Sequence, residues 1–469
     1  MGASFFFTED VFFHTVIVTT LAFTQVIPPK HFVPRGSAVA ARIGRRGGGK
    51  KLQGFILHRN RLDLANKARE EGLVAGETFR LADGMAVMQW DAYVPTKSPS
   101  VLLLNREEAV RQASDPSAWH RLLQLQGIPA VAEKSSRWNR KYYIALFQYQ
   151  VIGVYLFQRP LWQNRVTAPL RGIFVPQHKY TPEIRRAIRL AVSALYAVGL
   201  DFGGVVVGVP SSRSLQILQI DPIPRTTPLL VERYVRAFAR FCRRLEAAEE
   251  PIMGTDIEFL LVNREGQLVP ASRFLSYRGR VGCDAYRDPR SKGVYPIAEL
   301  RPVPSRHPLQ LYRNLYATMK YAYKKLRDTN LAWLAGNQPI AQLPIGGHLH
   351  FSRVPLHFLL VRVLDEYLAL PFRILEDPRG VSRRLRYGML GDVRNKPHGF
   401  EYRTLSSFIY TPKITLATFA LAKFLVEHHL KLPVGAFLHA DVLKAYYHGN
   451  GAELYRVADA KMSLLESMP

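Results

Sequence analysis

Four short segments in the second half of the chain share one pattern of ionisable residues. In each segment, two polar side chains stand at positions i and i+2 with an apolar residue between them. The segments are GTDIEFLLV with Asp256 and Glu258, PIAELRPV with Glu299 and Arg301, IGGHLHFS with His348 and His350, and GFEYRTLS with Glu401 and Arg403. Because residues i and i+2 of a strand point to the same face, each segment places two ionisable groups together.

The residue types in these segments indicate chemistry on anionic, phosphorylated groups. Carboxylates and imidazoles are ligands for Mg²⁺ or Mn²⁺, and arginine guanidiniums bind carboxylates and phosphates through paired donors. Taken alone, any one segment also fits the solvated face of a half-exposed strand. Surface strands favour Lys, Thr and Ser, however, and all four segments carry Asp, Glu, His or Arg instead.

These four segments need a sheet to bring them together. We expect each to be a strand of one antiparallel sheet, with the ionisable residues on one face. The apolar residues between them, Ile257, Leu300, Leu349 and Tyr402, then face the other way. Amphipathic patterns predict helices at 309–327, 356–375, 414–430 and 440–466, which would cover that apolar face.

The ordered set of motifs resembles the glutamine synthetase-like carboxylate–amine ligases, and within them the phage-type amidoligases. The motifs are GTDIEFLL, AELRPVPS, GGHLHFS and HGFEYRTLSS, and the resemblance covers residues 252–431. It implies a curved antiparallel sheet backed by helices, with ATP and Mg²⁺ or Mn²⁺ as cofactors. It also implies a two-step reaction, in which ATP phosphorylates a substrate carboxylate and an amine then attacks the acyl phosphate to give an amide or peptide bond.

The resemblance also implies roles for individual residues. The expected metal ligands are Asp256, Glu258, Glu299, His348 and Glu401, with His348 also near the nucleotide phosphates. Asp256 stands where a glutamate is more usual, which shortens the reach by one methylene. The arginines expected to act on phosphate or substrate are Arg301, Arg394 and Arg403, and Asp284 would hold the amine. His350 is either a nucleotide contact or a buried histidine with its hydrogen bonds satisfied.

The first half resembles an ATP-grasp domain. The resemblance lies in GIPAVAEKSS, YQVIGVYLFQR and ALYAVGLDFGGVVVGVPSSRSLQILQIDPIP. The metal-binding end of that pattern is altered: Gln219 and Asp221 replace the usual acid and asparagine, and Val205–Val207 replace the preceding strand acid. We therefore expect a degenerate domain in which Asp221 alone remains as a nucleotide-site acid. Lys134 and Arg159 are candidate phosphate contacts, or else a surface lysine and a strand-edge arginine.

Local signals in the first half predict its elements. A helix is expected at 106–127, and alternation predicts paired strands over 141–158. Thr181 and Pro182 are typical of a helix start, Gly199 of its end, and a further helix spans 227–245. The buried stripe of the helix that starts at Thr181 should consist of Ile184, Ile188, Val192 and Leu195.

Length and composition define the class of protein. At roughly 150 residues per domain, 469 residues predict several domains, which we place at 1–100, 101–248 and 251–469, in the α+β class. An apolar content of 48% excludes global disorder, and two cysteines argue against a disulfide framework and favour the cytoplasm. Residues 11–28 are apolar but lack a basic n-region, so buried strands fit them better than a signal peptide or a membrane span.

Three functions compete at this point. The first is a ligase acting through the second half on small-molecule or peptide carboxylates and amines. The second is a non-catalytic binding or scaffold protein of a cell-surface or coat assembly that retains both folds. The third, nucleic-acid binding driven by the net charge of +27, ranks last because no specific reader motif is present. The sequence leaves the oligomeric state open.

Overall fold

The structure is a computed structural model that describes residues 4–5, 52–78, 80, 82–94, 101–131, 138–158, 172–210, 214–288, 293–449 and 451–468. Its contacts define two compact units. The first contains Glu249–Val354, Phe372–Glu427 and the described N-terminal residues, and the second contains Lys51–Ala248, Pro355–Pro371 and His428–Pro469. Because a contact-defined unit is not necessarily a folding domain, the boundaries proposed from the sequence remain a prediction.

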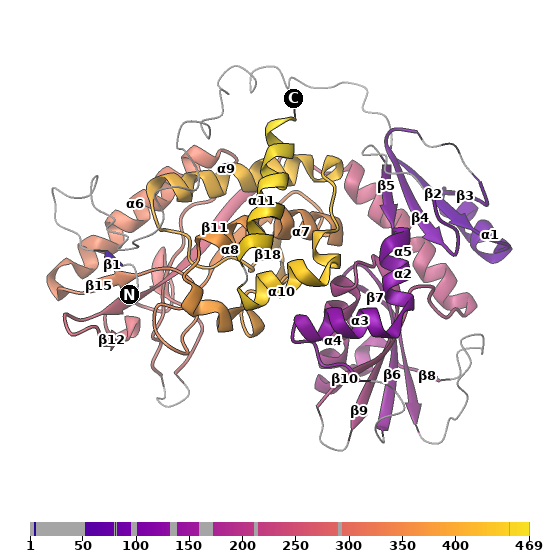
Figure 1. Cartoon of the computed structure of the whole chain (residues 1–469), viewed down its shortest axis with the longest axis horizontal. Coiled ribbons are helices and arrows are strands. Elements are labelled where there is room, and N and C mark those ends of the chain that lie inside the picture. The colour runs from indigo at the N-terminus through magenta and orange to yellow at the C-terminus, as the bar shows by residue number, and fades with distance from the viewer. Residues whose placement is uncertain are drawn as a thin grey trace. The chain divides into compact units, whose positions relative to one another are not determined.

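The first unit is built on a nine-stranded antiparallel sheet (Figure 1). Its main path runs β1-β15-β11-β16-β18-β17, while β12 and β14 also pair with β11 and β13 pairs with β14. The strands are β1 (Ser4–Phe5), β11 (Ile252–Val262), β12 (Leu268–Val269), β13 (Val281–Cys283), β14 (Ala298–Leu300), β15 (Ala332–Leu334), β16 (Gly347–Ser352), β17 (Val393–Lys396) and β18 (Gly399–Tyr402).

Two long helices accompany this sheet, α6 (Pro308–Leu326) and α9 (Pro412–His428). Helix α6 contacts β11 and β14 and buries Leu311, Leu315 and Ala322 (Figure 1). The apolar residues between the ionisable pairs are completely buried: Ile257, Leu300, Leu349 and Tyr402. The predicted α+β class is confirmed here, and the helix expected at 309–327 packs against the sheet as α6. The expectation for two other helices was wrong, because most of 356–375 and all of 440–466 belong to the second unit.

The second unit holds two sheets. The four-stranded sheet is parallel, in the order β3-β2-β4-β5, and the five-stranded sheet is antiparallel, in the order β10-β9-β6-β7-β8. The strands are β2 (Gln53–His58), β3 (Val74–Gly76), β4 (Met85–Trp90), β5 (Val101–Leu104), β6 (Trp138–Phe147), β7 (Gln150–Gln158), β8 (Ile173–Phe174), β9 (Phe202–Pro210) and β10 (Gln216–Asp221). Strands β6 and β7 form the hairpin predicted over 141–158.

The helices α1 (Leu62–Glu70), α2 (Glu107–Ser114), α3 (Pro116–Leu125), α4 (Pro182–Ala197) and α5 (Pro228–Glu246) accompany these sheets. The predicted start of α4 is confirmed, because the Thr181 hydroxyl accepts a hydrogen bond from the Ile184 amide. The predicted buried stripe was partly wrong. Alanines at 187, 191 and 194 are buried between Ile184 and Leu195, and Ile188 and Val192 are only half-buried.

Three helices predicted as continuous are interrupted. The helix expected at 106–127 divides at Asp115, whose side chain caps α3, and at Pro116, which lacks the amide hydrogen that would continue α2. The helix expected at 440–466 divides into α10 (Ala440–His448) and α11 (Gly451–Glu466), since Gly449 takes a left-handed conformation. Between α7 (Phe358–Leu364) and α8 (Leu370–Leu375) lies a π-helical turn, Asp365–Ala369.

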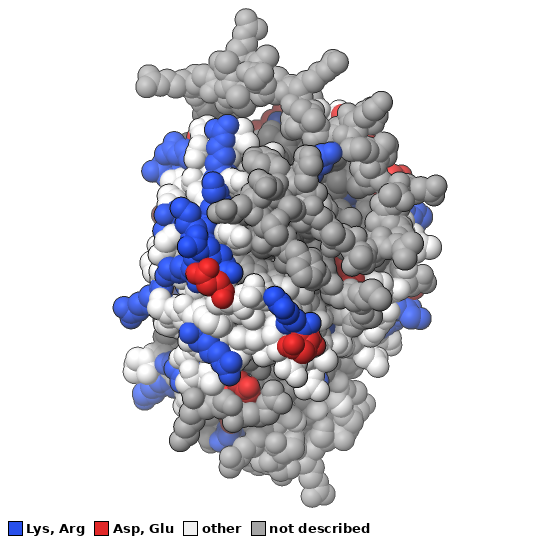
Figure 2. All heavy atoms as spheres, turned by 90° about the vertical axis from the view of Figure 1, so that its left-hand side faces the viewer, with Lys and Arg blue, Asp and Glu red and all other residues white. Residues whose placement is uncertain are grey.

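The surface charge of the first unit reflects the basic composition. Helix α6 contains no acidic residue and exposes Arg313, Lys320, Lys324 and Lys325. The side of the molecule that carries α6 faces the viewer in Figure 2, where Lys and Arg clearly outnumber Asp and Glu. No helix among the described residues is long and apolar enough to cross a membrane. The apolar segment 11–28 lies outside the described residues.

One glycine in the sheet permits a close backbone approach that the site requires. Gly399 has φ of +154°, and a Cβ atom there would lie 1.9 Å from the carbonyl oxygen of Phe351 on β16. Gly399→Ala should therefore destabilise the first unit by about 2–4 kcal/mol through strain and steric overlap. Gly254→Ala on β11 is the matched control, because its nearest contact would be an ordinary 3.5 Å. Equal unfolding midpoints for the two variants would contradict this assignment.

Candidate active site

The strand register brings the predicted residues to one face of the sheet. Across β11 and β16, Asp256 lies opposite His348, and across β11 and β14, Glu258 lies opposite Glu299. His350 on β16 faces Glu401 on β18. Directly opposed residues of an antiparallel pair point to the same side of the sheet. The ionisable residues of β11, β14, β16 and β18 therefore lie on one face, as their i and i+2 spacing predicts.

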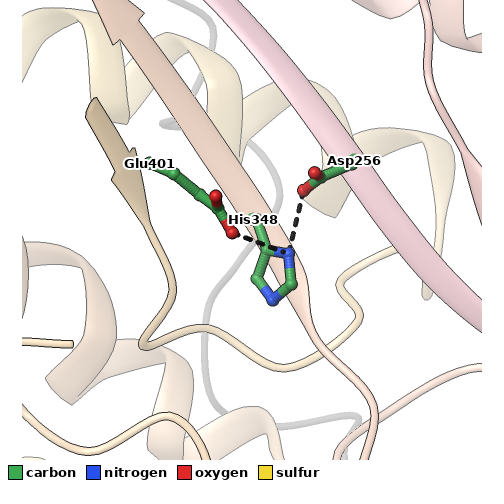
Figure 3. A group of neighbouring side chains, drawn as sticks. All are labelled: Asp256, His348 and Glu401. Atoms are coloured by element: carbon green, nitrogen blue, oxygen red, sulfur yellow. Dashed lines mark ion pairs between the residues drawn. The ribbon is translucent and has the colours of Figure 1, made fainter. Parts of the chain in front are cut away.

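Three of these side chains converge on a single point (Figure 3). Asp256 Oδ1 lies 2.9 Å and Glu401 Oε1 lies 3.5 Å from Nδ1 of His348. One ligand atom from each residue lies within 4.8 Å of the others, and all three side chains are buried or half-buried. Two carboxylates and one imidazole, each from a different strand, therefore form a compact cluster.

The geometry of this cluster fits a bound divalent cation. The buried Oδ1 atom of Asp256 lies 2.9 Å from Nδ1 of His348, which is its hydrogen-bond partner when Nδ1 carries a hydrogen. Two ligands of an octahedral ion with bonds of about 2.1 Å are separated by about 3 Å. The separations of 2.9 and 3.5 Å from Nδ1 of His348 are compatible with such an arrangement, and the donor set suits Mn²⁺ or Mg²⁺.

The charges in the cluster are strongly coupled. Burial alone would lower the pKa of His348, but the charge and hydrogen bond of Asp256 and the charge of Glu258 outweigh it and raise this pKa to about 9. Burial would raise the pKa of Asp256, but His348 and His350 hold it well below its usual value. Without a cation, a protonated His348 balances the acids. A cation bound at Nδ1 must displace that proton, so its affinity should increase with pH.

Glu258 and Glu299 form a second acidic pair beside this cluster. Burial raises the pKa of Glu258 to about 7, and burial together with the charge of Asp256 raises the pKa of Glu299 to about 9. Like-charged side chains directly opposite each other destabilise a sheet, and a cation nearby would relieve that repulsion. Neither residue belongs to the three-residue cluster, so their role as metal ligands stays a prediction.

Arg301 and Asp284 lie around this acidic pair. Arg301 forms an ion pair with Glu299 and donates to the carbonyls of Cys283 and Gly279 at 2.8 and 3.2 Å. Arg301, which directly follows β14, therefore contacts both the end of β13 and the chain before it. Asp284 accepts a hydrogen bond from the Tyr286 amide at 2.7 Å, and its charge contributes to the raised pKa of Glu258. Their predicted catalytic roles remain untested.

Glu401 is surrounded by basic groups. Arg403 Nε lies 3.1 Å from Oε1, while Lys396 Nζ and Arg394 lie 2.7 and 3.4 Å from Oε2. Burial would raise the pKa of Glu401, but the Lys396 hydrogen bond and the His348 charge lower it. Sequence reasoning missed Lys396. It stands two residues after Arg394 on β17, so the same parity argument would have found it.

His350 contacts the acid of the cluster directly. Its Nε2 atom lies 3.0 Å from Oδ2 of Asp256, and its ring stacks on His398 at 5.9 Å between centroids. The side chain is 17% exposed, so it is neither fully buried nor free in solvent. Its contact with Asp256 indicates that it orients this carboxylate, whichever of the two expected roles holds.

The remaining candidate residues belong to the first half of the sequence. Lys134 and Arg159 lie outside the described residues. Asp221 ends β10, where Arg225 Nε lies 2.9 Å from Oδ2 and Gln219 Nε2 donates to Oδ1 at 2.5 Å. Both carboxylate oxygens of Asp221 are thus occupied by protein groups, and Arg225 supplies the positive charge that a cation would otherwise bring.

Replacing Asp221 by Ala should therefore change ATP turnover only slightly. The expected effect is less than about threefold, because a carboxylate already neutralised by a guanidinium is a poor ligand for Mg²⁺. Steady-state ADP release by the variant and the wild-type chain makes the comparison. Complete loss of turnover in a variant that still folds would place the nucleotide chemistry in the second unit.

The fold brings two carboxylates and one imidazole, from three strands of one sheet, into a compact cluster. Residues 253–469 match the family Phage phiEco32-like COOH.NH2 ligase-type 2, which confirms the resemblance seen in the motifs of this part of the chain. A comparison with curated proteins gave no match.

Solved structures with similarity to the chain are ATP-grasp enzymes. The ATP-grasp ligase PsnB complexed with precursor peptide PsnA2 and AMPPNP is 9% identical, with a TM-score of 0.30 and coverage of 41% of this chain and 98% of that chain. The macrocyclase MdnB from Microcystis aeruginosa is 9% identical, with a TM-score of 0.27 and coverage of 40% and 98%. The RimK domain protein ATP-grasp from Sphaerobacter thermophilus is 12% identical, with a TM-score of 0.28 and coverage of 39% and 98%.

Proposed function

We propose that this protein is an ATP-dependent carboxylate–amine ligase whose reaction takes place on the ionisable face of the first unit's sheet. The observation that carries the proposal is the cluster of Asp256, His348 and Glu401, which converges within the region that matches the ligase family. Such a cluster suits a cation that neutralises phosphate charge. The substrates would be a carboxylate and an amine of small molecules or peptides.

The proposed reaction has two balanced steps. A substrate carboxylate oxygen attacks the γ-phosphorus of ATP, and the bond to the β-phosphate oxygen breaks to release ADP. The amine nitrogen then attacks the carbonyl carbon of the acyl phosphate. Inorganic phosphate leaves, and the nitrogen loses one proton. An acyl phosphate is required because a free carboxylate has no adequate leaving group.

Different residues of the site would bind the cation and the phosphate. Asp256, His348 and Glu401 would hold a divalent cation, with Glu258 and Glu299 beside them, and such a cation would neutralise phosphate charge. Arg403 is held by Glu401 and by Asp392, at 3.1 and 3.4 Å, so its guanidinium is aimed before substrate arrives. A donor fixed in this way stabilises transferring phosphate without reorganising. Arg394 is half exposed and pairs with Glu401 at 3.4 Å, so it would meet phosphate at the solvent side of the cluster.

An acyl-phosphate trap tests the proposal. The full chain is incubated with ATP, Mg²⁺, a peptide mixture and hydroxylamine, which replaces the amine and converts acyl phosphates to hydroxamates. We expect hydroxamate in amounts that follow ADP release, and neither product once Mg²⁺ is chelated. ADP and phosphate without hydroxamate would show that the protein is an ATP hydrolase.

A further inference from the structure

Tyr387 lies on the side of His348 that faces away from the cation cluster, and no sequence pattern pointed to it. Its hydroxyl oxygen lies 2.7 Å from Nε2 of His348 and donates a hydrogen bond to Oε1 of Glu258 at 3.0 Å. The residue follows the 3-10 helix Pro378–Leu385 and belongs to none of the strands that carry the other site residues. The two ring nitrogens of His348 therefore have different surroundings: the carboxylates of Asp256 and Glu401 lie near Nδ1, whereas Nε2 contacts the phenol and lies 3.9 Å from Oε1 of Glu258.

The hydroxyl has a single proton, and this fixes the direction of its hydrogen bonds. If Tyr387 donates to Glu258, it can only accept from His348, so Nε2 must carry a hydrogen. The opposite direction requires Glu258 to carry the proton instead. It also gives a neutral His348 with its hydrogen on Nδ1, pointing at Asp256 and Glu401. Only the first arrangement leaves an Nδ1 lone pair directed at the cation cluster.

Glu258 is placed to accept the hydrogen bond that the Tyr387 hydroxyl donates. Its second oxygen, Oε2, accepts a hydrogen bond from the Gly346 amide at 2.6 Å, and the Gly346 carbonyl accepts from the Glu258 amide at 2.9 Å. The carboxylate is thus held by the backbone on one side and by Tyr387 on the other. A histidine that ligates a metal through one nitrogen commonly donates its other N–H to such a second group, which sets its tautomer.

The tyrosine ring itself is held between two guanidiniums. The ring centroid lies 5.0 Å from the Arg383 guanidinium carbon and 5.3 Å from that of Arg403. Arg383 is buried and donates to the carbonyls of Ile345 and Leu405 at 3.1 and 2.9 Å, and to that of Thr404. The Arg383 contact involves the ring, whereas Arg403 lies near the ring and also forms a side-chain hydrogen bond with the hydroxyl. A phenylalanine keeps both ring contacts and should occupy the same position.

We propose that Tyr387 is a positioning residue that keeps a hydrogen on Nε2 of His348 and thereby presents the Nδ1 lone pair to the cation held with Asp256 and Glu401. The inference rests on the proposed function only in requiring that this cluster binds a cation. It needs neither ATP nor a substrate. Tyr387 would thus determine which nitrogen of the imidazole serves as ligand.

Direct cation binding tests the proposal on the full chain without nucleotide. Mn²⁺ is titrated into wild type, Tyr387→Phe and Tyr410→Phe. Tyr410 is the matched control, because it is, like Tyr387, a half-buried tyrosine of the same unit, and its hydroxyl pairs with Ser406 at 3.4 Å. The expected result is about tenfold to hundredfold weaker Mn²⁺ binding for Tyr387→Phe, the usual cost of removing the hydrogen-bond partner of a metal-binding histidine, and no change for Tyr410→Phe.

A second measurement determines the tautomer of His348 in the wild-type protein and needs a variant only to assign the signals. In wild-type protein labelled with ¹⁵N-histidine and saturated with Mg²⁺, His348 should show a hydrogen on Nε2 and none on Nδ1. His348→Gln identifies its signals by their loss. A hydrogen on Nδ1, unchanged Mn²⁺ affinity in folded Tyr387→Phe, or no Mn²⁺ binding by wild type would each overturn the proposal.

The two proposals fail separately. If wild type binds Mn²⁺ and Tyr387→Phe binds it more weakly, yet no hydroxamate forms, the positioning role stands and the ligase function falls. If hydroxamate forms while the two proteins bind Mn²⁺ equally, the ligase stands and Tyr387 has no part in setting the tautomer.

Discussion

Replacing Asp256 by Asn should abolish measurable Mn²⁺ binding and lower ATP-dependent amide formation by about a hundredfold to a thousandfold. The amide keeps the size of the carboxylate but removes its charge and presents a donor where a ligand is needed. Asp256 is also the group that contacts both His348 and His350, at 2.9 and 3.0 Å, so the loss affects the whole cluster.

Asp328→Asn is the control for this substitution. Asp328 belongs to the same unit but its side chain is 87% exposed, so the same chemical change there should leave Mn²⁺ affinity and turnover as in wild type. A folded Asp256→Asn variant with wild-type affinity for Mn²⁺ would show that the cation, if one acts, binds elsewhere.

Arg403→Lys should lower turnover by about tenfold to a thousandfold, the cost of losing one donor aimed at the transition state. The guanidinium contacts Glu401, Asp392 and the Tyr387 ring together, and an ammonium cannot reproduce these contacts because it lacks the planar fork. The apparent KM for ATP should change less than kcat, since the interaction strengthens as phosphate transfers.

A different result would assign Arg403 a structural role. If its purpose is only to neutralise Glu401, the lysine variant should keep nearly full turnover and unfold at a lower temperature. Arg313→Lys, on the exposed side of α6, controls for the substitution itself and should alter neither quantity. Steady-state kinetics and a melting curve on both variants decide between the two roles.

The parity of residues within strands allowed most of the site to be predicted. Asp256, Glu258, Glu299, His348 and Glu401 occupy one face because a strand alternates strictly and a register error would reverse every side chain. Lys396 obeys the same rule. Tyr387 does not, because it comes from a chain segment outside the strands, and its position depends on packing against Arg383 and Arg403.

Some helix interruptions could likewise be predicted from the sequence, and one could not. The breaks at Asp115–Pro116 and at Gly449 have local causes that are visible in the sequence, and a stricter use of proline and glycine signals would have predicted them. The π-helical turn Asp365–Ala369 has no such signal. All five of its residues are buried, including Asp365 and Glu366, and these two acids contact Tyr196 and Lys461, which lie far away in the sequence.

The fate of carboxylate oxygen tests the central claim most directly. The chain is incubated with ATP, Mg²⁺, hydroxylamine and a peptide mixture whose carboxylates carry ¹⁸O, and the phosphate released is analysed by mass spectrometry. Transfer through an acyl phosphate leaves one carboxylate oxygen on the phosphate. We therefore predict ¹⁸O-labelled phosphate from wild type and almost none from Asp256→Asn. Phosphate that is released without label, or labelled equally in both proteins, would contradict a ligase acting through the Asp256, His348 and Glu401 cluster.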